Sequence, residues 1–318
     1  MAAPTPISPL DGVAVVVPIV TPLLPDGRPD LDSLRSLLDF VLTAGVDGVL
    51  ALGSSGESVS LSRADRELVG AAVVEHVGQR RHVMLGLPTA GTADAREEAA
   101  RLAALGPGSI LAALPAGLRH SDSELRAHFA TIAGAGAPVV VYDVPGRAGA
   151  ALEIATVAAL AEDGTAVALK DSTGDVVKAR RYARALAGRD GFRMLTGCEE
   201  VIDGSLLAGY HGAVPGLANV FPRWHVALAQ AAAEGRWERA SALQAGIVEL
   251  MDLYFQPIPG ASFMASFLGT VKEALRQLGV IEHNVSSAPI TPVDAALVAH
   301  VTQALARATE LEAVLTDG

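Results

Sequence analysis

The sequence predicts an α/β protein, a closed (β/α)8 barrel followed by a C-terminal helical appendage. Short β-rich runs recur eight times, stretches with helical periodicity separate them, and beyond residue 220 the pattern becomes helical only. Most of the runs are continuously apolar, as expected for parallel strands that are buried on both faces. These observations together favour a barrel in which strands and helices alternate.

The predicted strands cover residues 13–20, 46–52, 82–87, 109–114, 139–144, 166–170, 192–196 and 212–217. The predicted helices between them cover residues 31–42, 63–76, 93–105, 124–132, 152–160, 176–186 and 200–207. From the start of one strand to the start of the next, the units are about 20 to 36 residues long. Eight units of this length are typical of a TIM barrel.

An open doubly wound sheet is the alternative arrangement of such units. Sheets of this kind usually carry a glycine-rich dinucleotide loop directly after their first strand. Here that position reads Val20-Thr21-Pro22. The stretch Gly134-Ala135-Gly136 precedes a predicted strand, where it is typical of a helix C-cap and a loop. The closed barrel is therefore the preferred prediction.

Helical periodicity alone continues through residues 223–234, 237–254, 263–278 and 292–315, and Pro257-Ile258-Pro259-Gly260 separates two of these helices. We expect the first of them to complete the barrel and the others to form the appendage. The predicted division is a barrel over residues 1–235 and a C-terminal helical subdomain over residues 236–318.

The composition indicates a soluble protein with a large core. Half of the residues are hydrophobic and 19% are charged, which suits one large α/β domain or two smaller ones. The net charge of −11 disfavours nucleic acid as a partner and leaves no polybasic anchor for a membrane. Residues 1–6 lack the basic and apolar regions of a signal peptide, and no apolar run reaches the length of a membrane span. We therefore expect a cytoplasmic location.

Cysteine and histidine usage argues against a metal centre. Cys198 is the only cysteine, which excludes an intrachain disulfide and a cysteine-rich zinc site. The eight histidines are scattered singly, without a pair at the spacing of metal ligands. We expect neither a metal ion nor a cofactor.

Lys170 is the residue that points most directly to chemistry. It ends the apolar run Ala166-Val167-Ala168-Leu169 and is followed by Asp171-Ser172-Thr173-Gly174. In a barrel this places its amine at the C-terminal rim of the strands, where functional residues gather. Burial disfavours the ammonium ion, and a neutral lysine is a nucleophile toward carbonyl groups. A strand-end lysine that simply reaches water is the ordinary alternative.

Two further strand ends carry residues of complementary chemistry. Lys170 follows Tyr142 by 28 residues, about one strand–helix unit, so we expect the two on adjacent strands at similar height. A phenol beside a nucleophilic amine can shuttle protons. The turn Gly53-Ser54-Ser55-Gly56 offers N–H groups and two hydroxyls to a small carboxylate, and Arg147 can pair with a second one. Three strand ends that supply an anion receptor, a phenol and an amine together indicate a site.

Four motifs follow one another along the predicted barrel. They are Gly53-Ser54-Ser55-Gly56-Glu57-Ser58, Tyr142-Asp143-Val144-Pro145-Gly146-Arg147, Val167-Ala168-Leu169-Lys170-Asp171-Ser172-Thr173-Gly174 and Leu217-Ala218-Asn219-Val220. Their order and spacing resemble those of the dihydrodipicolinate synthase and N-acetylneuraminate lyase family of pyruvate-dependent class I aldolases. The resemblance spans essentially the whole barrel.

The resemblance implies a role for each matching residue. Lys170 would form a Schiff base with the keto group of pyruvate or another 2-keto acid, and Tyr142 would relay protons. Ser54 takes the place of the family's relay threonine. Ser55 takes the place of the residue whose hydroxyl and N–H hold the pyruvate carboxylate, and Val214 that of an apolar residue that lines the pyruvate pocket.

One segment departs from the pattern of dihydrodipicolinate synthases. Arg147 matches the arginine that binds the carboxylate of aspartate semialdehyde in those enzymes. After the fourth strand, however, they carry a tyrosine pair following proline, the second of which reaches into the neighbouring subunit's site and completes the proton relay. Here Pro115 is followed by Ala116 and Gly117. His120 is a candidate substitute for the missing phenol, although a loop histidine is usually just exposed. The small residues leave space for a bulkier acceptor.

The preferred hypothesis is therefore a class I aldolase or lyase whose acceptor is open, with 4-hydroxy-2-oxoglutarate and 2-keto-3-deoxy sugar acids as candidate substrates. A true 4-hydroxy-tetrahydrodipicolinate synthase, which condenses pyruvate with aspartate semialdehyde, is the first alternative. A catalytically silent barrel that binds a keto acid is an alternative of another class. A lysine-linked pyridoxal phosphate enzyme lacks an evident phosphate cup. The resemblance also implies a homo-oligomer, a tetramer built as a dimer of dimers.

Overall fold

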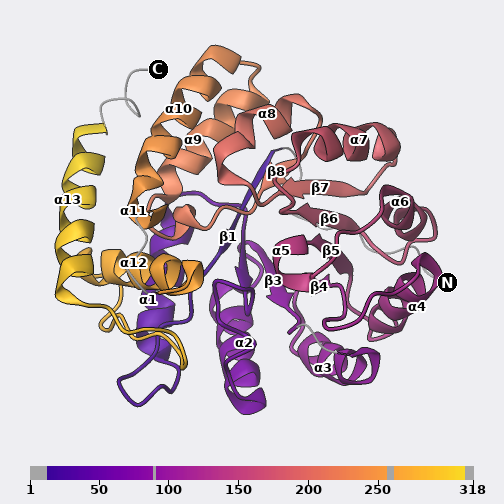
Figure 1. Cartoon of the computed structure of the whole chain (residues 1–318), viewed down its shortest axis with the longest axis horizontal. Helices are drawn as coiled ribbons and strands as arrows, with labels where there is room; N and C mark the ends of the chain where they lie inside the picture. Colours follow the sequence, from indigo (N-terminus) through magenta and orange to yellow (C-terminus); the bar gives the residue numbers. More distant parts are fainter. Residues whose placement is uncertain (1–12, 89–90, 256–260, 312–318) are drawn as a thin grey trace.

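The computed structural model describes residues 13–88, 91–255 and 261–311, and it confirms the predicted barrel (Figure 1). Eight parallel strands close in sequence order, and β1 pairs with both β2 and β8. They are β1 (Ala14–Pro18), β2 (Gly48–Ala51), β3 (His82–Gly86), β4 (Ser109–Ala113), β5 (Val139–Asp143), β6 (Ala168–Asp171), β7 (Arg193–Thr196) and β8 (Gly212–Ala213). Nearly every strand residue is buried, because side chains fill the barrel inside and helices cover it outside.

The helices that cover the barrel begin close to the predicted positions. They are α1 (Leu31–Thr43), α2 (Arg63–Val77), α3 (Thr92–Ala104), α4 (Asp122–Ala133), α6 (Ile154–Glu162), α7 (Val176–Leu186) and α8 (Ile202–Leu207). The side chains of Asp30, Ser62, Ser121 and Asp175 accept hydrogen bonds from N–H groups in the first turns of four of them. These caps satisfy donors that have no partner within the helix.

The eighth strand is shorter than the predicted run over residues 212–217, which was wrong beyond Ala213. Val214 still donates its N–H to Thr196, but Pro215 has no N–H with which to continue the ladder. The chain then turns into the short 3-10 helix η2 (Leu217–Asn219). Val214 therefore lies at the very rim of the barrel.

The structure divides two predicted helices and adds one that the sequence did not predict. The helix expected over residues 200–207 begins with the 3-10 turn η1 (Glu199–Val201), because Val201 departs from helical geometry with φ −138° and ψ 32°. The helix expected over residues 237–254 consists of α10 (Trp237–Leu250) and α11 (Asp252–Phe255). The additional helix is α5 (Pro145–Ala148), a single turn that follows β5.

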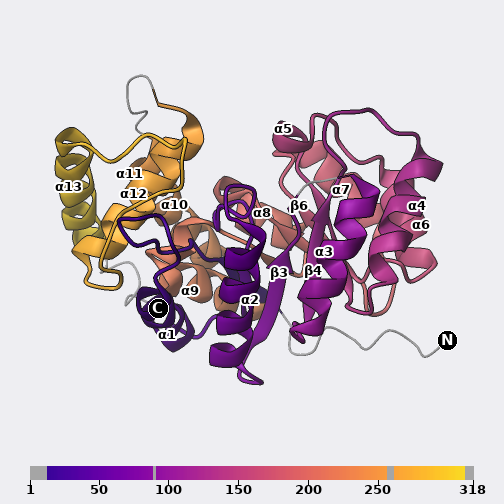
Figure 2. The ribbon, with the colours of Figure 1, turned by 90° about the horizontal axis from the view of Figure 1, so that it is seen from below.

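The C-terminal helices lie together beside the barrel. Helix α9 (Pro222–Ala233) packs on β1, and α10 packs on α9. Figures 1 and 2 show α11, α12 (Phe263–Gln277) and α13 (Ala295–Leu311) grouped at the end of the molecule opposite α4 and α6. The helix predicted from residue 292 begins at Ala295, and Pro257-Ile258-Pro259-Gly260 lies outside the described residues. The division at residue 235 stays a prediction.

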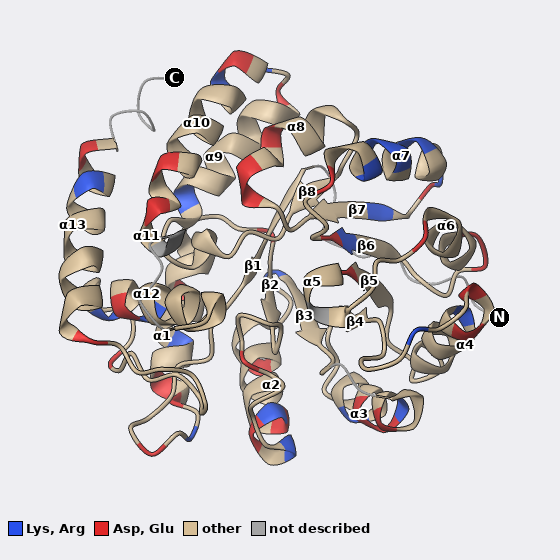
Figure 3. Ribbon diagram, viewed as in Figure 1, with Lys and Arg blue, Asp and Glu red and all other residues tan. Residues whose placement is uncertain are grey.

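The apolar core has two layers. One lies between the strands and the surrounding helices. The other fills the barrel, with side chains such as Val16, Leu50, Met84 and Leu111, and Tyr142 belongs to it. Figure 3 shows charged residues gathered on the outer helices, including a basic run on α7, while most of the ribbon near the barrel axis is uncharged. No helix in the described ranges is both long enough and apolar enough to span a membrane.

Candidate active site

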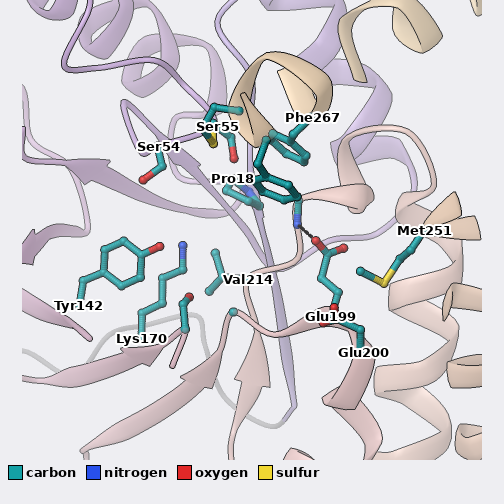
Figure 4. Close-up of a pocket in the computed structure, with 15 residues that line it drawn as sticks. Pro18, Ser54, Ser55, Tyr142, Lys170, Glu199, Glu200, Val214, Met251 and Phe267 are labelled. Atoms are coloured by element: carbon teal, nitrogen blue, oxygen red, sulfur yellow. Dashed lines mark hydrogen bonds between the residues drawn. The ribbon is translucent and has the colours of Figure 1, made fainter. Parts of the chain in front are cut away.

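The structure places Lys170 and Tyr142 side by side at the C-terminal rim of the barrel. They are register partners on β6 and β5, as predicted. Lys170 is 6% exposed and Tyr142 is 9% exposed. The Lys170 Nζ atom lies 4.4 Å from the centre of the Tyr142 ring, and Figure 4 shows the phenol and the amine ending next to each other. The nearly buried Lys170 amine thus lies beside the Tyr142 phenol, a group that can donate and accept protons.

The residues that follow these two point outward and anchor both strands. Asp143 accepts hydrogen bonds from Lys178 Nζ at 2.6 Å and from the Tyr182 hydroxyl at 2.9 Å. Asp171 accepts one from the Tyr210 hydroxyl at 2.6 Å. Burial and the adjacent carboxylates raise the pKa of both tyrosines far above the usual range, so the phenols remain protonated and donate. Alternation along each strand directs the side chains of Asp143 and Asp171 outward and those of Tyr142 and Lys170 inward.

The chain contains three lysines, and the structure gives them different environments. Lys178 is ion-paired with Asp143, and Lys272 is ion-paired with Glu57 at 2.5 Å. Among the described residues, Lys170 has no ion-pair partner. Of the three lysines, Lys170 is the one that lines the pocket at the barrel rim.

The predicted serine turn lies across the pocket from these residues (Figure 4). Ser54 and Ser55 both line the pocket that contains Lys170. The turn is tight: Leu52 and Glu57 have positive φ values of 58° and 56°. A Cβ atom at Gly56 would stand 2.9 Å from the Leu52 nitrogen, so the turn requires glycine there.

Glu57 fixes this turn through partners that sequence reasoning missed. Its carboxylate accepts a hydrogen bond from Lys272 Nζ of α12 and two more, each at 2.7 Å, from the N–H and hydroxyl of Ser287. Lys272 also donates to the Val285 carbonyl at 2.7 Å. Burial lowers the pKa of Lys272, and the Glu57 carboxylate opposes that change. Because Glu57 and Lys272 are 215 residues apart, no local signal could have revealed the pair.

The pocket has a volume of about 200 Å³ and contains most of the predicted site residues. Ser54, Ser55, Tyr142, Lys170 and Val214 all line it. The sequence did not predict the other lining residues, which come from the end of β1, from the segments after β6, β7 and β8, and from the C-terminal helices. They are Pro18, Ser172, Gly197, Glu199, Glu200, Gly216, Met251, Phe263, Met264 and Phe267. Most of this side of the pocket thus comes from segments that follow the barrel strands in sequence.

Glu199 holds the segment that follows β8. Its carboxylate accepts hydrogen bonds from the N–H groups of Gly216 and Leu217, both at 2.9 Å. His225 donates from Nδ1 to the Phe221 carbonyl, and its Nε2 lies 3.7 Å from a Glu199 oxygen. Glu199 thereby positions the backbone next to Val214 at the edge of the pocket.

The structure does not bring the two other predicted residues into this group: one side chain is not described and the other lies elsewhere. Arg147 belongs to α5, but its side chain lies outside the described residues. His120 lines a separate cleft between α4 and α6, with Asp122 and Glu153, and does not reach the Lys170 pocket. The role of His120 as a substitute for the missing phenol stays a prediction. Within the described ranges, no group of three His, Cys, Asp or Glu side chains has the geometry of a metal site.

Comparison with known proteins identifies the family. The model of the dihydrodipicolinate synthetase family matches residues 12–308. The chain is 33% identical over 305 residues to a 4-hydroxy-tetrahydrodipicolinate synthase of Xanthomonas campestris pv. campestris. The alignment covers 94% of this chain and 96% of that protein.

Solved structures agree in fold over the same length. The 4-hydroxy-tetrahydrodipicolinate synthase of Methylacidiphilum fumariolicum SolV aligns with a TM-score of 0.85 at 26% identity, over 96% of this chain and 98% of that one. A dihydrodipicolinate synthase of Acinetobacter baumannii complexed with pyruvate aligns with a TM-score of 0.84 at 28% identity, over 94% and 99% of the two chains. The chain therefore belongs to the dihydrodipicolinate synthetase family and is an enzyme of the pyruvate-dependent class I aldolase and lyase type.

Proposed function

We propose that Lys170 forms a Schiff base with pyruvate or another 2-keto acid, and that the enzyme then makes or breaks a carbon–carbon bond next to the imine. The observation that carries this proposal is the register pairing of Lys170 with Tyr142 at one pocket, across from the Ser54-Ser55 turn. The pyruvate in the Acinetobacter baumannii structure supports a keto acid as the ligand.

The pocket walls supply the binding groups. The Ser55 hydroxyl and the backbone N–H groups of the turn hold the keto-acid carboxylate, because consecutive N–H groups form an anion-binding concavity. Val214 packs against the methyl or methylene carbon of the substrate. Arg147 binds a carboxylate of the second substrate when there is one. The ion pair between Glu57 and Lys272 anchors the turn to α12, on the side away from the substrate.

The chemistry follows from the amine and the phenol. The Lys170 amine attacks C2 of the keto acid, and loss of water gives the imine. Tyr142, with Ser54, carries the protons that this dehydration and its reversal require. The protonated imine withdraws electrons, so loss of a C3 proton gives an enamine that adds to an aldehyde. In the opposite direction, the C3–C4 bond of a 4-hydroxy-2-keto acid breaks and the aldehyde leaves.

Borohydride trapping tests the Schiff base. Reduction in the presence of pyruvate converts the imine into a stable secondary amine, and peptide mapping locates it. We expect the label on Lys170, with Lys178 and Lys272 of the same digest as internal controls, and no label in Lys170→Arg. A protein that turns over keto acids but carries no label on Lys170 refutes the proposal.

The role of Tyr142 is tested by Tyr142→Phe, which keeps the ring and removes the hydroxyl. We expect kcat to fall by about 10²- to 10⁴-fold, the usual contribution of a positioned proton carrier. Unfolding curves check that the variant is folded. A variant as active as the parent excludes the phenol from the proton path.

The reaction direction and the acceptor are separate questions. We propose a cleavage aldolase, with 4-hydroxy-2-oxoglutarate and 2-keto-3-deoxy sugar acids as candidate substrates, because Ala116 and Gly117 stand where synthases carry tyrosines. The 4-hydroxy-tetrahydrodipicolinate synthase of Xanthomonas campestris pv. campestris supports a synthase as the second candidate. Coupled assays with aspartate semialdehyde and with the hydroxy keto acids decide between them. Steady release of pyruvate from any 2-keto acid eliminates a catalytically silent barrel.

We further propose a cytoplasmic homotetramer, a dimer of dimers, in line with the family resemblance of the four motifs. Nucleic acid and membranes are not expected as partners, given the net charge of −11. Sedimentation velocity at several protein concentrations tests the assembly, and a single monomer peak throughout contradicts it.

A further inference from the structure

Lys178 does not line the Lys170 pocket, but its side chain is held inside the protein. It is 16% exposed, whereas the three arginines of the same helix, α7, are exposed. Its Nζ atom donates to Asp143 Oδ2 and to the Leu152 carbonyl, each at 2.6 Å. Because these two acceptors replace most of the water around the ammonium group, the amine is held in one place.

Asp143 and Leu152 are themselves joined to each other and to α7. Asp143 is fully buried, and its Oδ1 atom accepts the Leu152 N–H at 3.0 Å. The Tyr182 hydroxyl lies 2.9 Å from Asp143 Oδ2 and 3.2 Å from the Leu152 carbonyl. The end of β5 and the start of α6 are therefore connected to α7 through one buried cluster, in which Lys178 is the cation.

A path of hydrogen bonds leads from the end of β6 to the same lysine. Asp171 directly follows Lys170, and its Oδ1 atom accepts from the N–H and the hydroxyl of Thr173 at 3.0 and 2.8 Å. The Thr173 hydroxyl accepts from the Asp175 N–H at 3.2 Å, and the Asp175 carboxylate accepts from the Lys178 N–H at 2.9 Å. Each of these bonds spans two or three residues, so the turn after β6 is compact and places Lys178 at a fixed position.

The ion pair of Lys178 completes this path into a ring. Asp171 and Asp143 are register partners at the ends of β6 and β5. From Asp171 the path leads to Lys178, and the ion pair at 2.6 Å returns it to Asp143. The strand ends that present Lys170 and Tyr142 are thus connected twice, once through the backbone ladder and once through Lys178.

We propose that Lys178 is a positioning residue for proton transfer by Tyr142 and that it acts through Asp143. The inference rests on the proposed Schiff base at Lys170. In that reaction the Lys170 amine bonds to C2 of the keto acid, and one amine proton passes to the C2 oxygen through the Tyr142 hydroxyl. A second proton, from water, lets this oxygen leave as water while the nitrogen keeps its remaining proton.

The position of the phenol decides how fast these protons move. Tyr142 and Asp143 are consecutive residues of β5 with side chains on opposite faces, so a strand end that turns at Asp143 also turns the phenol. A displacement of about 1 Å in a catalytic arrangement can slow a reaction about 10²-fold. Loss of the Lys178 contacts should therefore slow proton transfer, while the turn of Ser54 and Ser55 across the pocket keeps its own supports.

A double-mutant cycle between Lys178→Met and Tyr142→Phe tests the proposal. The measurement is the rate constant of imine formation from pyruvate in a single turnover, followed by borohydride quenching and mapping of the label on Lys170. Lys178→Met should slow this step at least about tenfold when the phenol is present, and less than about threefold in Tyr142→Phe. A residue that acts through the phenol has no further effect once the hydroxyl is gone. The loss of thermal stability should be the same in both backgrounds.

Lys272→Met is the matched control, because Lys272 is also buried and paired with a carboxylate. It should weaken pyruvate binding to the same extent with and without the Tyr142 hydroxyl. If Lys178→Met does not fold, Tyr182→Phe removes one hydrogen bond from Asp143 and should slow imine formation about threefold, again only when the phenol is present.

The outcomes separate this proposal from the Schiff base itself. Equal fold losses from Lys178→Met, or from Tyr182→Phe in its place, in both Tyr142 backgrounds overturn the positioning role and leave the Schiff base intact. An unchanged rate in the variant with the phenol present has the same consequence. Absence of the label on Lys170 in the parent protein overturns both.

Discussion

The buried ion pair between Glu57 and Lys272 makes the stability of the barrel depend on α12, and Lys272→Met tests this dependence. Methionine keeps most of the apolar volume of the lysine stem and removes the charge. The two side chains are 1% and 0% exposed, so the remaining Glu57 carboxylate would keep only its two hydrogen bonds from Ser287. Removing one partner of a buried pair costs about 3–5 kcal/mol, because the other charge is left uncompensated.

A loss of this size should lower the apparent thermal midpoint by about 4–8 °C in a protein of this length. The variant should also bind keto acid less tightly, with KM raised about tenfold, since Glu57 belongs to the turn that presents Ser54 and Ser55. Thermal unfolding followed by circular dichroism and steady-state kinetics measure the two effects. Arg307→Met, which removes an exposed partner of Glu249, is the control and should cost at most about 1 kcal/mol.

The double variant Glu57→Gln, Lys272→Met separates the charge from the packing. It leaves no buried charge, so it should recover at least half of the stability lost in Lys272→Met. If Lys272→Met is as stable as the parent, the buried pair does not hold the turn. If the double variant is no better than the single one, packing around α12 accounts for the loss instead.

Three further outcomes follow from the barrel rim and from helix α4. Asp143→Asn removes the charge that pairs with Lys178 and should lower the free energy of unfolding by about 3 kcal/mol in urea titrations, and an unchanged midpoint contradicts the anchor. Gly197→Ala places a methyl group 2.0 Å from Ser172 Oγ and 3.2 Å from Lys170 Cε, so borohydride trapping should slow at least tenfold, with partial recovery when Ser172→Ala is added. If Gly197→Ala is trapped as fast as the parent protein, the methyl group does not crowd Lys170. Burial is the main cause that lowers the pKa of His128 from 6.5 in the folded protein, and the charge of His120 adds to it. The folded state therefore favours the neutral ring, while the unfolded chain takes up a proton near pH 6.5. The free energy of unfolding should decrease as the pH drops through and below 6.5. Urea unfolding between pH 5 and pH 8 should show a slope of at most about 1.4 kcal/mol per pH unit from this group, which His128→Gln removes.

Local patterns in the sequence were sufficient for the barrel and for the centre of the site. Continuous apolar runs, helical periodicity and N-cap residues are each determined by neighbours in the chain, and the strands and helices lie close to the predicted ranges. The spacing of Tyr142 and Lys170 by one strand–helix unit predicted their pairing, because closed parallel barrels keep adjacent strands in a fixed register. The end of β8 was missed because Pro215 and the Glu199 hydrogen bonds redirect the chain there.

The sequence by itself therefore determined the fold class and the pairing of Tyr142 with Lys170, the nucleophile that we propose. Only the tertiary structure revealed that Lys272 lies against Glu57 and that the C-terminal helices supply Met251 and Phe267 to the pocket. Those contacts join residues far apart in the chain, and each depends on how several elements pack at once. Periodicity and motifs indicate which face of a helix or strand is buried. They do not indicate which residue from a distant part of the chain packs against that face.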